Sequence, residues 1–123
     1  DIAHNIKKRY LFLYRNSLQS MVKKKYDKMI VKKSDKSGKK YMAVFTDTSS
    51  GRTKTTHFGA AGMTDYLMSK DKDRRARYRS RHKKDLQTRD PTRSGYLSYY
   101  LTWGDSTSLR TNVSAYKKRF GFK

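Results

Sequence analysis

The residues with the clearest chemical character are the positively charged side chains of one continuous stretch. Between Lys70 and Arg89, ten lysines and arginines stand against three aspartates. One-signed positive surfaces attract phosphates or carboxylates, so we predict a contact surface for a polyanion or an acidic partner. The residues assigned to this surface are Arg74, Arg75, Arg77, Arg79, Arg81, Lys83 and Lys84.

The rest of the sequence offers little that could catalyse a reaction. There are three scattered histidines and no cysteine, and all ten acidic residues are aspartates. No paired carboxylates and no nucleophile motif accompany the histidines. The sequence therefore predicts a protein that is not an enzyme, with no catalytic residue, no cofactor and no metal ligand.

Composition limits the fold that can present these charges. The 123 residues carry a net charge of +21, and only 34% of them are hydrophobic. A chain of this length forms one small domain, and self-repulsion of this size is relieved by an anionic partner. The aromatic fraction of 13% argues against disorder and supplies most of the expected core.

The segment before the basic stretch has the two-residue period of β-strands. Strands are predicted over residues 29–33, 41–46 and 52–58, separated by polar turns that contain Gly38 and Gly51. In the middle strand Tyr41, Ala43 and Phe45 share one face. The result is a three-stranded antiparallel β-meander.

A glycine-rich elbow, marked by Gly59 and Gly62, connects the last strand to the basic stretch. It lacks the lysine of a P-loop, so a tight structural connection is favoured over a phosphate cradle. Ser69 is the expected N-cap of a basic helix over residues 70–86. A stripe of Tyr78, His82 and Leu86 is expected to face the core.

Two short helices are predicted after Pro91. The first is aromatic, covers residues 96–103 and ends at Gly104. The second is capped by Ser106 and ends at Gly121. Its apolar stripe consists of Leu109, Val113, Tyr116 and Phe120.

Residues 1–25 are predicted to form a basic arm outside the single domain of residues 26–123. The arm carries aromatic side chains that could anchor a partner, namely Tyr10, Phe12 and Tyr14. It could form a short helix, add a strand to a neighbour, or pack on its own domain. The complete fold class is α+β: the meander, the basic helix, two short C-terminal helices and the N-terminal arm.

Several motifs together resemble a family of small basic proteins from nucleocytoplasmic large DNA viruses, the giant and algal viruses. They are HFGAAGMTDY at residues 57–66, KD at 70–71, RHKK at 81–84 and the aromatic segment 95–103. The resemblance extends over about residues 40–120 and brings no established activity. It implies a virion protein at the capsid interior or inner capsid surface, present in the host cytoplasm or nucleus during assembly.

Two binding functions follow from charge and resemblance together. The first is a minor capsid protein, a structural component that binds capsid or other virion proteins through basic and aromatic surfaces. An acidic viral inner membrane beneath the shell is a further surface that it could approach. The alternative is a sequence-independent DNA-binding virion protein that contacts phosphates through the arginine-rich helix.

Overall fold

A computed structural model describes residues 1–11 and 25–123 of the chain. Three antiparallel strands form one sheet in chain order, β1 (Lys28–Lys33), β2 (Lys39–Thr46) and β3 (Thr53–Ala60). The predicted meander is confirmed, and β3 runs two residues further than expected, into the glycine elbow.

The inner face of the sheet builds one side of the core. Met29 lies opposite Phe45 in the β1–β2 register, and both side chains are fully buried together with Ala43 and Phe58. These residues alternate with more exposed ones such as Ile30, as the two-residue period requires. Tyr41, Ala43 and Phe45 share one face of β2 as predicted, and that face is the inner one.

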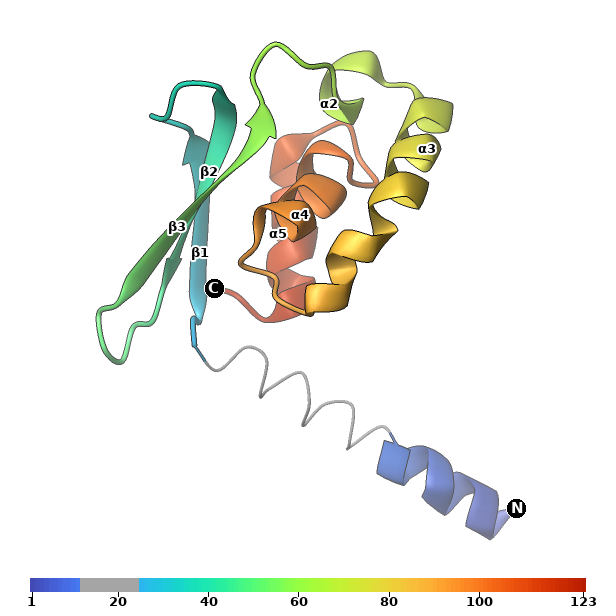
Figure 1. Cartoon of the computed structure of the whole chain (residues 1–123). Coiled ribbons are helices and arrows are strands. Elements are labelled where there is room, and N and C mark those ends of the chain that lie inside the picture. Colours follow the sequence, from blue (N-terminus) through green and yellow to red (C-terminus); the bar gives the residue numbers. More distant parts are fainter. Residues whose placement is uncertain (12–24) are drawn as a thin grey trace.

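Helical segments follow the sheet and cover its inner face, so the α+β class is confirmed (Figure 1). The segments α4, η2 and α5 pack on the sheet, and α3 forms the outer layer beyond them. In chain order the segments are α2 (Tyr66–Ser69), α3 (Lys72–His82), the 3₁₀ helix η1 (Lys83–Thr88), α4 (Ser94–Leu97), the π-helix η2 (Ser98–Thr102) and α5 (Leu109–Phe120). In the described residues, no helix is long and apolar enough to cross a membrane.

The predicted helix over residues 70–86 is wrong at both ends. Lys70 adopts a left-handed conformation with φ of 56° and ends α2, so Ser69 is not an N-cap. Asp71 caps α3 instead, because its carboxylate accepts hydrogen bonds from the backbone N–H groups of Asp73 and Arg74. The α-helical geometry ends at His82 and continues as η1.

The C-terminal helices also differ in detail from the prediction. The aromatic helix begins at Ser94 and widens into the π-helix η2, and Ser108 rather than Ser106 caps α5. The stripe of α5 does face the core, where Tyr116 is buried and donates a 2.5 Å hydrogen bond to the Pro91 carbonyl. Asn112, which the pattern did not single out, is buried beside it.

The described part of the N-terminal arm is helical over residues 2–11. Ile2, Ile6 and Tyr10 follow a four-residue spacing along it, and their exposed fractions are 80%, 63% and 72%. The helical alternative for the arm therefore holds over these residues. Phe12 and Tyr14 lie outside the described residues.

Candidate anion-binding surface and adjoining cleft

The basic residues of α3 and η1 divide into an outward row and an inward pair. Arg74, Arg77, Arg81 and Lys84 are exposed and recur at three- and four-residue steps, which places them along one side of the helix. We call these four residues the cationic ridge. Ten residues at about 1.5 Å each make the ridge roughly 15 Å long.

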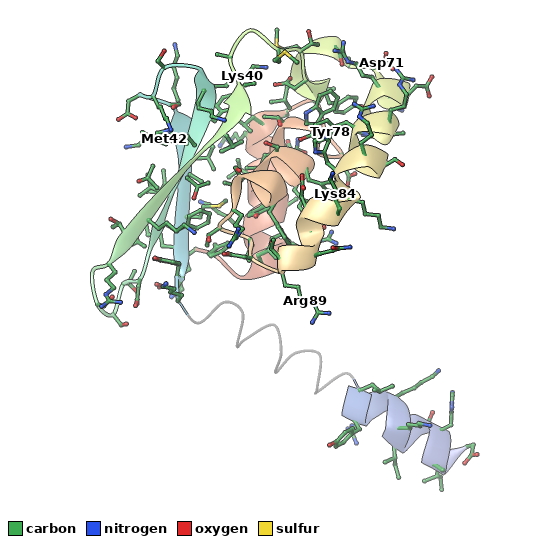
Figure 2. All side chains as sticks on the ribbon, in the orientation of Figure 1. Lys40, Met42, Asp71, Tyr78, Lys84 and Arg89 are labelled. Carbon is green, nitrogen blue, oxygen red and sulfur yellow. The ribbon has the colours of Figure 1, made fainter. Side chains whose placement is uncertain are left out.

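No carboxylate in the described part of the chain forms an ion pair with the cationic ridge. Lys83 is also exposed, but the helical period turns it away from the row. Five of the seven residues predicted for partner contact are therefore available at the surface. Figure 2 shows the side chain of Lys84 on the outer layer of the molecule.

Arg75 and Arg79 differ from the other five residues predicted for partner contact, because the guanidinium groups of both bond to the protein's own backbone. The Arg75 guanidinium donates a 3.0 Å hydrogen bond to the Asp105 carbonyl and lies 4.5 Å from the ring centre of Tyr66. Arg79 donates through Nε to the Trp103 carbonyl at 2.9 Å. These two inner arginines fasten α3 to the turn that follows η2.

The carboxylate of Asp105 completes this attachment. Arg79 Nη2 lies 2.9 Å from Asp105 Oδ1, and the hydrogen bond from Arg79 holds the pKa of Asp105 below its usual value. The Asp105 side chain is 93% exposed, so the ion pair itself adds little stability. The stronger restraint is the bond from Arg79 to the Trp103 carbonyl, because that contact is partly buried.

A stack of three rings lies beside the inner arginines. Trp103 stacks on Tyr78 with ring centres 4.3 Å apart, and Tyr78 stacks on His82 at 4.2 Å. Burial raises the pKa of Tyr78 above its usual value. The predicted stripe of Tyr78, His82 and Leu86 thus faces inward. The helical spacing could not show that Trp103 is the residue on which Tyr78 stacks.

The glycine elbow is held by side chains rather than open to a ligand. Gly59 and Gly62 have φ of +77° and +81°, values that favour glycine. A Cβ on Gly59 would lie 3.4 Å from Lys40 Cβ, so the positive φ rather than a lack of space favours glycine at this position. Lys40 Nζ donates to the Asp65 carboxylate at 2.8 Å and to the Met63 carbonyl, and it thereby fixes the elbow against β2 (Figure 2).

A cleft of about 270 Å³ lies between this elbow, α3 and η2. Its wall includes Trp103, Tyr78 and His82, with two ridge residues, Arg74 and Arg81, on the same lining. No motif in the sequence outlines the cleft, because its sides come from three separate segments. The elbow glycines were the only hint, since they marked a point where the backbone turns sharply.

The histidine of the ring stack has a carboxylate partner. His82 Nδ1 lies 3.1 Å from Asp85 Oδ2, and the imidazole ring stacks on Tyr78. Within residues 1–11 and 25–123, no cluster of three histidines or carboxylates could hold a metal ion. The arrangement is suited to binding an anionic partner.

Comparison with known protein families gives a match to part of the chain. Residues 29–82 are similar to a family of unknown function, DUF5754. No curated protein and no solved structure matches the chain. The similar region contains the sheet, the elbow and α3, and so includes Arg74, Arg77 and Arg81 of the cationic ridge but neither Lys84 nor Trp103.

Proposed function

We propose that the protein is a non-enzymatic structural component of a large DNA virus particle, a minor capsid protein. In this role the cationic ridge docks on an acidic surface of neighbouring capsid proteins at the inner side of the shell. The observation that carries the proposal is the ridge itself, whose positive charges have no ion-pair partner among the described residues. The virion setting comes from the resemblance of the elbow and helix motifs to proteins of these viruses.

Two further features support a protein partner. Residues 2–11 expose Ile2, Ile6 and Tyr10 along one side of a helix, an apolar surface that phosphates do not need. The inner arginines fasten the helix that carries the ridge, so the ridge is a fixed surface rather than a loose basic tail. Fixed charges of one sign select a partner by electrostatic complementarity.

Retention on emptied virus shells tests this proposal. The ridge variant replaces Arg74, Arg77, Arg81 and Lys84 with Gln, and the control replaces four exposed lysines of the sheet side, Lys28, Lys32, Lys33 and Lys36. After nuclease treatment, wild type and control should remain with the shells, while the ridge variant is released at lower salt. Loss of the wild-type protein together with the DNA contradicts the proposal.

Nucleic acid is the second candidate partner, and the regular spacing of the ridge favours it. Phosphate contacts from a straight row of four cations give affinity without sequence preference. Neutralising four phosphates predicts a slope of about −3.6 in a plot of log binding constant against log salt concentration. Titration of random duplex DNA measures this slope, and an unchanged slope in the ridge variant rejects the candidate.

A further inference from the structure

The cleft beside the cationic ridge has the size of a single side chain rather than of a cofactor. Its volume of about 270 Å³ lies just below the range of roughly 300–1,000 Å³ that is typical of small-molecule pockets. The structure shows what holds it open: Lys40 fixes the elbow on one side, and the inner arginines fix α3 on the other. The cleft is therefore a rigid feature of the fold.

Two of the charged residues that line the cleft form an ion pair with each other. Lys40 and Asp65, which both line it, lie 2.8 Å apart and neutralise each other. The aromatic rings of Tyr78 and Trp103 form part of its wall. Near the elbow the wall includes Met63, whose side chain is 62% exposed and is of an unbranched, adaptable type that is common at protein-binding surfaces.

The uncompensated positive charge lies on one side of the cleft. Arg74 and Arg81 line it and belong to the ridge, and no carboxylate of the described residues pairs with either. A cleft with aromatic and methionine side chains in its wall, beside free arginines, matches a segment in which acidic residues flank an apolar one. Arginine binds such carboxylates through two parallel hydrogen bonds.

We infer that this cleft is the socket for one aromatic or aliphatic side chain of an acidic peptide segment on the partner protein. The inference rests on the proposed function and specifies the partner's chemistry: an apolar anchor residue flanked by aspartates or glutamates. The anchor fills the cleft, and the flanking carboxylates pair with Arg74 and Arg81. Anchors of this kind contribute most of the binding energy of many protein interfaces.

The ring stack favours a peptide over an unpaired nucleic-acid base. A base binds by stacking on an open aromatic face. Tyr78 is stacked with Trp103 and with His82, and Trp103 is only 8% exposed. An apolar side chain needs only contact with the rings, which this wall provides.

Trp103 allows a direct test, because it is the only tryptophan of the chain and lines the cleft. Its fluorescence is followed during titration with the peptide Asp-Asp-Phe-Asp-Asp, with the same peptide carrying Ala in place of Phe, and with a single-stranded oligonucleotide of equal charge. The Phe peptide should give a saturable change, and the Ala peptide should bind about tenfold more weakly. The oligonucleotide should leave the Trp103 signal unchanged.

Matched variants separate the cleft from the rest of the ridge. The double variant Arg74→Gln and Arg81→Gln should weaken binding of the Phe peptide about tenfold. The control pair, Arg77→Gln with Lys84→Gln, removes the same charge outside the cleft lining and should weaken it less than threefold. Met63→Ser, at an exposed position, should weaken binding of the Phe peptide and leave binding of the Ala peptide unchanged.

Equal binding of the Phe and Ala peptides, or an equal response of Trp103 to the oligonucleotide, overturns the inference. The shell-retention experiment keeps this result distinct from the proposed function. If shell retention depends on the ridge but the protein does not prefer the Phe peptide, only the socket is rejected. A clear preference for the Phe peptide without shell retention rejects the capsid role.

Discussion

Two arginines of α3 that lie two positions apart are expected to differ strongly in how much the same substitution destabilises the fold. Arg79 is bonded to the Trp103 carbonyl and to Asp105, whereas Arg77 is exposed on the cationic ridge. Glutamine has nearly the helix propensity of arginine, so Arg79→Gln and Arg77→Gln differ mainly in the contacts that they remove. The pair therefore tests whether the inner arginines hold the fold together.

The contacts of Arg79 set the expected magnitude. A hydrogen bond from a charged group contributes about 1.5–3 kcal/mol, and the 24% exposure of the Arg79 side chain favours the lower end. The ion pair with the exposed Asp105 adds roughly 0.2–1 kcal/mol. We expect Arg79→Gln to lower the free energy of unfolding by about 2 kcal/mol, and Arg77→Gln to change it by less than about 0.5 kcal/mol.

Urea denaturation followed by Trp103 fluorescence and by circular dichroism measures both values. Arg79→Lys serves as a control that keeps the charge but not the planar guanidinium, and it should recover less than half of the loss. Equal free energies of unfolding for Arg77→Gln and Arg79→Gln would refute the division of α3 into an outer ridge and an inner pair. A larger loss for Arg77→Gln would refute it more strongly.

Three further changes test the core and its pH dependence by the same urea method. Tyr116→Phe leaves the buried Pro91 carbonyl without its hydroxyl donor and should cost about 1–3 kcal/mol. Gly104→Ala should cost about 1–3 kcal/mol or more, because the new Cβ would lie 2.2 Å from the Tyr100 carbonyl oxygen. Burial raises the pKa of Asp90, but the hydrogen bonds from Thr92 and nearby positive charges outweigh burial and hold that pKa below its usual value. The contribution of Asp90 to stability is therefore present above about pH 4 and is lost as the pH falls through the folded-state pKa. Asp90→Asn should therefore lose less stability than wild type between about pH 5 and pH 3, and an identical acid response would contradict this reasoning.

The sheet could be predicted because its signals are local. Residues 41–46 are rich in aromatic and β-branched side chains, and glycine turns separate the strands. The first residue of α3 could not be predicted, because Ser69 and Asp71 are both good N-cap residues. The left-handed conformation of Lys70 decides between them, and nothing in its side chain indicates that conformation.

The basic helix of the site could be predicted from the sequence, but the contacts of its individual arginines could not. Helical period identified the charged stretch and its aromatic stripe, and the structure adds Trp103 to that stripe. It could not separate the inner arginines from the ridge, because their partners are backbone carbonyls of the turn after η2. Backbone carbonyls occur at every residue, so the sequence does not show which of them Arg75 and Arg79 will reach.

The most direct test of the central claim is a reconstruction of virus particles emptied of DNA by nuclease treatment. The proposed capsid role predicts density for the three-stranded sheet and its helices at fixed positions on the inner side of the shell. In that density, the cationic ridge faces an acidic surface of a neighbouring protein. Absence of this density from emptied particles, with the protein recovered in the released DNA fraction, would contradict the claim.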